Sequence, residues 1–146
     1  MLRLFVLLTL LLTGCQSRDP KKARELVFWC SNNGGEIQFA KEFTDRWQRT
    51  RPDKPLRYQP IPEGQSSEEI ILASVVGKTT PDIYANMWQG SVELYAKAGV
   101  LVPLDTIADF RTFIRARCDS AMIREITSSD GHIYQVPWKV NPIMTL

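Results

Sequence analysis

Short apolar stretches that alternate with helical patterns constrain this fold more than any other feature of the sequence. The stretches that predict strands lie at residues 25–30, 56–61, 82–86 and 133–140. Between and after the first three lie helical patterns: an apolar stripe that ends before Pro52, a capping box formed by Ser66 and Glu69, and the segments 92–98 and 105–115. This alternation is typical of an α/β fold with a mostly parallel sheet flanked by helices.

The loops at the carboxyl ends of parallel strands are where such folds bind ligands. Here these loops cover residues 30–35, 62–65 and 86–90. The first and third carry hydroxyl, amide and indole side chains, namely Ser31, Asn32, Asn33, Asn86, Trp88 and Gln89. Amides both donate and accept hydrogen bonds, and the flat face of an indole can lie against a sugar ring. The loops therefore favour a neutral, polyhydroxylated ligand.

The N-terminal residues 1–15 predict export. Arg3 precedes an apolar run at residues 4–12, which at about 1.5 Å per residue is too short to cross a bilayer core of roughly 30 Å and indicates a secretory signal. The run ends in the sequence LTGC, which resembles the bacterial lipobox, where cleavage leaves the cysteine as a lipid-modified N-terminus. The alternative is an ordinary signal with a chance cysteine. We expect a signal peptide at 1–14, lipidation of Cys15, a tether at 15–24 and an extracytoplasmic, membrane-anchored protein.

Composition argues against several classes of protein. The 18 basic and 16 acidic residues leave the net charge near zero, without the basic stripe of a nucleic-acid-binding protein. His132 is the only histidine and has no cysteine or carboxylate at ligand spacing, so we expect no metal site. No Gly-x-Ser-x-Gly elbow and no complete phosphate loop occur, so no cofactor and no enzymatic step are expected. In an exported protein, Cys30 and Cys118 could pair in a disulfide or remain buried thiols, and both alternatives stay open.

Four segments, in this order, resemble the bacterial extracellular solute-binding proteins of the sugar-binding, maltose-binding-like type. They are the lipobox, LVFWCSNNGGE, TTPDIYANMWQGSVELYAKAGVLVPLD and DGHIYQVPWKVNPIM. The resemblance implies a periplasmic-binding-protein-like (type II) fold, in which two α/β lobes are hinged around a ligand cleft. Residues 25–146 would form part of the N-terminal lobe, ending at the first crossing between the lobes. The second lobe would be absent from this chain, so we expect the N-terminal portion of a longer, truncated receptor.

The resemblance also implies a set of ligand contacts, which come from the loops after the first and third strands and from the first crossing. By position these are Ser31, Asn32, Asn86, Trp88, Gln89, Trp138 and Asn141. Each has a structural alternative: the asparagines near Gly34 could cap a helix, and Trp138 could belong to the core. Lys139 is expected to be solvated. The neutral pair Trp88-Gln89 departs from the charged residue that the family often has in the third loop.

These observations lead to one functional hypothesis and two alternatives. The hypothesis is a lipid-anchored, monomeric receptor that captures a sugar or oligosaccharide and delivers it to the permease subunits of an ABC importer. A receptor of the same fold for another small solute is one alternative, although an anion site should show arginine in the three loops and none is present. The other is a small envelope lipoprotein that acts as an interaction module.

Overall fold

A three-stranded parallel sheet forms one half of the molecule. The computed structural model describes residues 24–62 and 67–139. Strand β1 (Leu26–Cys30) is central and pairs with β2 (Leu56–Pro60) on one side and β3 (Ile83–Tyr84) on the other, giving the order β2-β1-β3. Leu26 lies opposite Leu56, and Phe28 lies opposite Ile83. The α/β class and the parallel sheet predicted from the alternating pattern are confirmed, with a third strand shorter than expected.

Helix α2 (Gly34–Thr50) covers this sheet because its apolar side chains recur on one face. The helix begins where the Asn33 side chain accepts hydrogen bonds from the backbone N–H groups of Gly35 and Glu36, at 3.0 and 3.3 Å. Its face packs on the sheet and forms the first hydrophobic core. The buried members are Phe28, Cys30, Ala40, Leu56 and Ala85.

Five further helical elements follow. They are α3 (Ser67–Val76), α4 (Gln89–Lys97), the 3-10 turn η1 (Leu104–Thr106), α5 (Phe110–Arg117) and α6 (Ser120–Glu125). The single helix predicted at 105–115 is wrong, because Asp109 adopts a left-handed conformation with φ of 65° and separates η1 from α5. Helix α6 was not predicted. None of the described helices is long and apolar enough to span a membrane.

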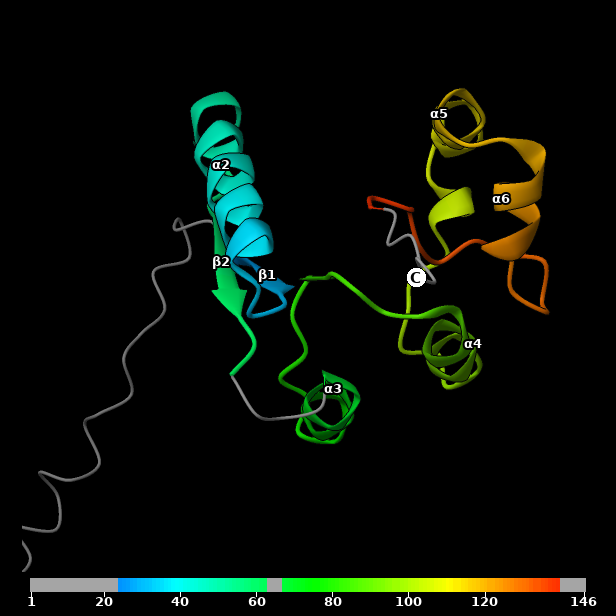
Figure 1. Cartoon of the computed structure of the whole chain (residues 1–146), viewed down its shortest axis with the longest axis horizontal. Coiled ribbons are helices and arrows are strands. Elements are labelled where there is room, and N and C mark those ends of the chain that lie inside the picture. Colours follow the sequence, from blue (N-terminus) through cyan, green and yellow to red (C-terminus); the bar gives the residue numbers. More distant parts are fainter. Residues whose placement is uncertain (1–23, 63–66, 140–146) are drawn as a thin grey trace, which may run out of the picture.

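A second, separate core lies on the other side of the molecule (Figure 1). Phe110 and Ile114 of α5 pack there with Ile126 and Ile133. The final strand predicted at 133–140 does not form in the described part. Only Ile133 makes an isolated antiparallel bridge, to Thr127, and residues 134–139 run on without belonging to a strand. An apolar pattern can form a strand only where another strand lies alongside, and no described strand pairs with residues 134–139.

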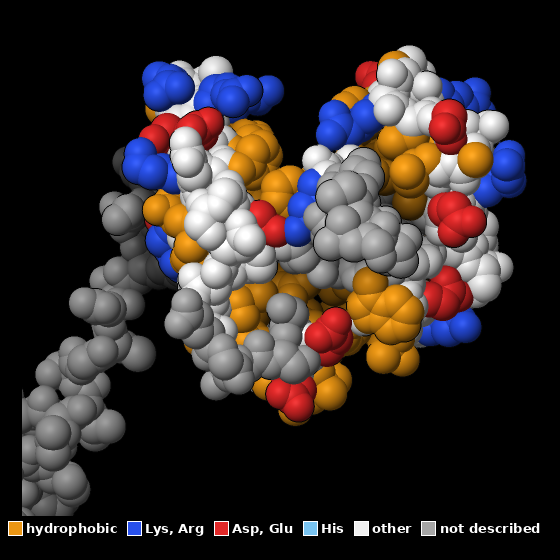
Figure 2. Space-filling model, viewed as in Figure 1, with side chains coloured by type: hydrophobic (Ala, Val, Ile, Leu, Met, Phe, Trp, Pro, Cys, Tyr) orange, Lys and Arg blue, Asp and Glu red, His pale blue; other side chains and the backbone are white. Residues whose placement is uncertain are grey.

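A wide hollow separates the two halves (Figure 2). Its volume is about 1070 Å³, and we call it the groove. Strand β3, helix α4 and residues 134–139 all contribute side chains to it. The groove runs along β3 from Asp82, before the strand, to Asn86, after it, and so reaches the carboxyl end of the sheet, where ligand-binding loops were expected.

Candidate functional site

A nearly buried carboxylate gathers the loops at the carboxyl end of the sheet. Glu36 lies in the first turn of α2, and its side chain is only 11% exposed. It accepts hydrogen bonds from the Ser31 hydroxyl, from the Asn86 amide Nδ2 and from the Lys139 ammonium. The three donors come from the loop after β1, the loop after β3 and the segment 134–139. One side chain thus connects all three regions that the sequence linked to ligand binding.

The environment keeps Glu36 ionised. Burial by itself would raise its pKa, but the hydrogen bonds from Lys139, Ser31 and Asn86 outweigh it and lower the pKa below its ordinary value. The Lys139 ammonium supplies the compensating positive charge. Burial, together with the nearby Glu36 charge, also raises the pKa of the Cys30 thiol. The cluster is therefore a neutralised ion pair with two additional hydrogen-bond donors.

Asn86 has one hydrogen-bonding group to spare. Its backbone is left-handed, with φ of 71°, a conformation that asparagine tolerates better than most residues. While Nδ2 donates to Glu36, the buried Oδ1 has no hydrogen-bond partner among the described residues. Asn86 also lines the groove. A buried carbonyl oxygen without a partner is costly, so this atom can accept a hydrogen bond from a water or a ligand hydroxyl.

Two tryptophans border the same groove. Trp88 precedes α4 and is 65% exposed, and its indole lies over Gly90, where a Cβ atom would come within 2.1 Å of the ring. Trp138 contacts Phe39 with ring centroids 5.1 Å apart, at the edge of the first core. An exposed indole that rests on a glycine offers a flat apolar face to solvent, as stacking on a sugar ring requires.

The structure brings only some of the predicted site residues together. Ser31 and Asn86 meet at Glu36, while Trp88, Trp138 and Asn86 line the groove. Gln89 accepts a hydrogen bond from Gln135, which ties the start of α4 to the segment 134–139. The Asn32 side chain is exposed, and its neighbour Asn33 is the residue that caps α2. Asn141 and Cys15 lie outside the described residues.

Sequence reasoning missed the two charged members of the cluster. Glu36 is not among the predicted contacts, although its position three residues after Asn33 matches the spacing of a capping box. Lys139 is exposed, as expected, but its ammonium also pairs with Glu36, which the sequence did not predict. No local signal could have found that pair, since 103 residues separate its members.

The possible disulfide does not form in this structure. Cys30 and Cys118 are both free thiols. Cys30 is buried in the first core, beside α2, whereas Cys118 packs against the second core at the end of α5. Of the two alternatives that the sequence left open, the structure therefore has the separate thiols.

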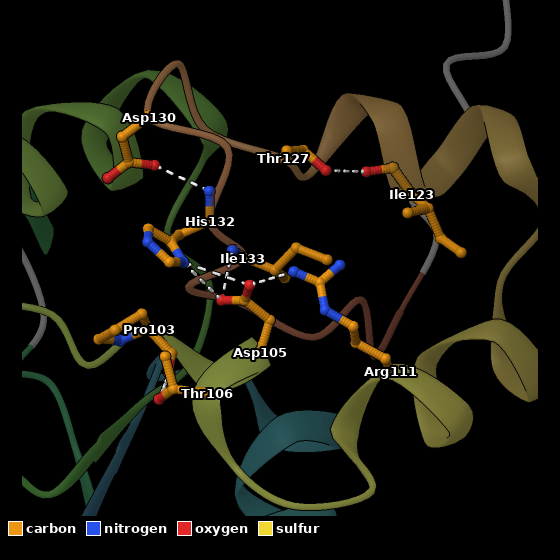
Figure 3. Close-up of polar contacts among 9 residues, drawn as sticks. All are labelled: Pro103, Asp105, Thr106, Arg111, Ile123, Thr127, Asp130, His132 and Ile133. Atoms are coloured by element: carbon orange, nitrogen blue, oxygen red, sulfur yellow. Dashed lines mark hydrogen bonds and ion pairs between the residues drawn. The ribbon is translucent and has the colours of Figure 1, made fainter.

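A second polar cluster holds the other half of the molecule together (Figure 3). The Asp105 side chain, 2% exposed, accepts from Arg111 at 2.6 Å and from the backbone N–H of Ile133 at 3.2 Å, and lies 3.1 Å from Nδ1 of His132. Every bond joins elements of the same half. Within the described residues, no three His, Cys, Asp or Glu side chains are grouped to hold a metal ion. We therefore assign this cluster a structural role.

Comparison with protein families identifies the class of protein. The family model described as "Bacterial extracellular solute-binding protein" matches residues 31–145. The chain therefore belongs to the bacterial extracellular solute-binding proteins. Membership places its working site outside the cytoplasm. No curated protein matches the chain significantly.

Solved structures of longer proteins share the fold. An uncharacterised protein, lmo0859 from Listeria monocytogenes, aligns with a TM-score of 0.70 and 23% identity, over 77% of this chain and 28% of its own. A protein from a study of xylan utilisation by Caldanaerobius polysaccharolyticus aligns with a TM-score of 0.61 and 22% identity, over 78% of this chain and 28% of its own. RafE of Streptococcus pneumoniae aligns with a TM-score of 0.61 and 13% identity, over 80% of this chain and 28% of its own. The chain thus spans about 28% of the length of these neighbours.

Proposed function

We propose that this chain is the N-terminal part of a two-lobe receptor that captures a neutral sugar or oligosaccharide for an ABC importer. The observation that carries the proposal is the meeting of three loops at Glu36, beside a groove bordered by two tryptophans. A second lobe would close over this surface and supply the remaining contacts. Ligand that bridges both lobes would stabilise the closed form, which the importer reads.

The charges at the site favour a neutral ligand over an ion. Lys139 lines the groove beside the predicted contacts, and its ammonium is occupied by Glu36. Glu36 is in turn neutralised, so neither charge is free to select an anion or a polyamine. What remains exposed is the face of Trp88, which suits a sugar ring, while the unpartnered Asn86 carbonyl oxygen is buried and would meet a ligand hydroxyl group only after its side chain moves. The xylan context of one structural neighbour agrees with a carbohydrate.

We also propose a lipid anchor at Cys15 and a monomeric receptor whose partners are the permease subunits. The lipobox-like ending of the signal supports the anchor, and family membership supports an importer as the partner. We propose no enzymatic step and no cofactor. A receptor for another small solute of the same fold remains the alternative, and the ligand panel below separates it from the first proposal.

The test begins with the natural product in the membrane fraction. Its mass, measured by immunoblot and mass spectrometry, shows whether it is acylated and whether it extends beyond Leu146. The protein so defined is then mixed in turn with neutral mono- and oligosaccharides, polyamines and phosphate, and its thermal unfolding is measured with each. A ligand at a hundred times its Kd should stabilise the fold by about 2.7 kcal/mol. Stabilisation by polyamine or phosphate, with none by any sugar, would overturn the carbohydrate proposal.

A matched pair of variants then locates the site. Trp88→Ala should weaken sugar binding about fivefold, because stacking on an aromatic ring contributes roughly 1 kcal/mol. Phe113→Ala removes an aromatic side chain that is 49% exposed on α5 and does not line the groove, so it should leave affinity unchanged. Equal losses in both variants would remove Trp88 from the site.

A further inference from the structure

A basic surface lies at the end of α2 farthest from the candidate site. It consists of Arg46 and Arg49 on the last turns of α2, with Arg51 and Lys54 in the turn before β2, and we call it the basic end. All four side chains belong to exposed residues. Figure 2 shows Lys and Arg side chains gathered over this end of the helix. Within the described residues none of the four forms an ion pair.

Besides Lys139, five other cations of the described chain have carboxylate partners, whereas Lys78, Arg115 and Arg124 lack an ion pair within the described residues, as the basic end does. The pairs are Lys41–Asp45, Arg57–Glu25, Arg24–Asp82, Lys97–Glu93 and Arg111–Asp105. At the basic end, Asp53 is the one carboxylate in the turn 51–55, against Arg51 and Lys54. Some of this charge stabilises the helix terminus, where the backbone dipole favours cations. That effect is confined to the last turn, so it does not account for Lys54.

The basic end is also where the N-terminal segment meets the fold. The backbone N–H of Leu26, at the start of β1, donates to the carbonyl of Pro55 at 2.8 Å, next to Lys54. The sequence that precedes β1, residues 16–24, is itself basic, with Arg18, Lys21, Lys22 and Arg24 against the single acid Asp19. Basic residues therefore outnumber acidic ones both in the segment after the predicted lipid attachment and at the basic end.

We propose that the basic end rests on the anionic phospholipid headgroups of the membrane to which the chain is tethered. This inference depends on the membrane anchoring in the proposed function, but not on the ligand. Basic residues near an anionic membrane surface contribute about 1 kcal/mol each, over distances of a Debye length of about 8 Å at physiological salt. The 17 residues of α2 span about 25 Å, so the site at its other end stays outside this field.

The test uses the protein without its predicted signal, residues 1–14, and with Cys15→Ala, so that both the apolar signal and the predicted lipid are removed. Sedimentation with vesicles of phosphatidylglycerol and phosphatidylcholine should capture this protein, whereas vesicles of phosphatidylcholine alone should not. The triple variant Arg49→Gln, Arg51→Gln, Lys54→Gln should bind the anionic vesicles about a hundredfold more weakly, at roughly fivefold per charge. Raising the salt from 0.01 to 0.15 M should weaken the wild-type protein's binding far more than the variant's.

A second triple variant, Lys78→Gln, Arg115→Gln, Arg124→Gln, provides the control, because it removes the same charge from exposed positions elsewhere. Equal weakening by both triple variants, or equal binding to neutral vesicles, would overturn the proposal. Inorganic phosphate should compete no better than sodium chloride of the same ionic strength. Stronger competition would mean a discrete phosphate site, which also overturns it. Sugar binding should be the same in both triple variants. Failure of the membrane-contact proposal is therefore distinguishable from failure of the receptor proposal.

Discussion

At the scale of single residues, Glu36 connects more segments of the candidate site than any other side chain described above. Its carboxylate is nearly buried, stays ionised and is satisfied by donors from three segments. A buried charge is tolerated only when it is paired and hydrogen-bonded, and here the pairing also fixes where Asn86 and Lys139 lie. Glu36 is therefore a positioning residue for the loops that we assign to the ligand.

Glu36→Gln should destabilise the fold by about 1–3 kcal/mol, because it leaves the Lys139 ammonium without its counter-charge. Urea unfolding followed by circular dichroism measures this difference. Glu42→Gln on the same helix is the control, since Glu42 is exposed and only accepts a bond from Gln38 at 3.0 Å. A loss no greater than that of the control would show that the cluster adds nothing to stability.

Gly90 should be as important as Trp88 for the position of the indole. In Gly90→Ala the new Cβ would lie 2.1 Å from a ring carbon, so the exposed indole must swing away. We expect a changed near-ultraviolet dichroism spectrum and about fivefold weaker sugar binding by the complete receptor. Gly34→Ala meets nothing within 4 Å and serves as the control. An unchanged spectrum would contradict the placement of the ring over Gly90.

At the scale of secondary-structure elements, the Asp105 cluster joins η1, α5 and the chain after the turn at Gly131. Gly131 adopts φ of 86°, and its N–H donates to the Ser128 carbonyl at 2.9 Å, which closes a tight turn. The turn brings the backbone of Ile133 to the Asp105 carboxylate. Few backbone bonds connect these short elements, so this carboxylate provides much of their connection.

The Asp105 contribution should depend on pH. Burial alone would raise its pKa, but the bonds from Ile133 and His132 and the charge of Arg111 lower it below the ordinary value. A lowered pKa stabilises the fold above the unfolded-state value of roughly 4, and that stability is lost as pH falls through the folded-state pKa. The difference in unfolding free energy between wild type and Asp105→Asn should therefore shrink on acidification from about pH 5 to about pH 2.

Urea titrations across this pH range test the prediction, with the exposed Asp53→Asn as the control. The control should show almost no stability difference from wild type at any pH. A difference for Asp105→Asn that stays constant down to about pH 2 would contradict the role assigned to the ionised carboxylate.

At the scale of the whole molecule, two cores lie on either side of the groove. The first joins the sheet to α2, whereas in the second α5 packs mainly on η1 and α6. Ile114 is 2% exposed at the centre of the second core. The contacts across the groove centre on the pairs Glu36–Lys139 and Phe39–Trp138, and the two cores share no residue. A substitution in either core should therefore destabilise mainly its own half.

Ile114→Ala should cost about 2–5 kcal/mol in the second core, through lost burial and the cavity left behind. Hydrogen exchange should then accelerate in α5 and α6, while the amides of β1 keep their protection. The opposite pattern is expected for Phe28→Ala, which removes a buried side chain from the first core. Uniform acceleration across both halves in either variant would mean that they unfold as one cooperative unit.

Several features of the fold could be predicted from sequence because short-range physics decides them. Asn33 caps α2 through bonds to residues two and three positions away, and the apolar stretches at 26–30 and 56–60 form adjacent strands. The loops at the carboxyl ends of these strands follow directly from a parallel sheet. Ser31 and Asn86 were accordingly predicted as polar residues of those loops, and their role as ligand contacts stays a prediction.

Tertiary structure alone decided the rest, because it depends on which distant segments become neighbours. The Glu36–Lys139 pair joins residues 103 positions apart, and nothing near either residue in the sequence indicates its partner. Residues 134–139 have an apolar pattern, but in the described chain no strand lies beside them. Cys30 and Cys118 pack in different cores. Local sequence determines which elements form and which side chains their ends present, whereas packing determines which of those side chains meet and therefore which charges are neutralised.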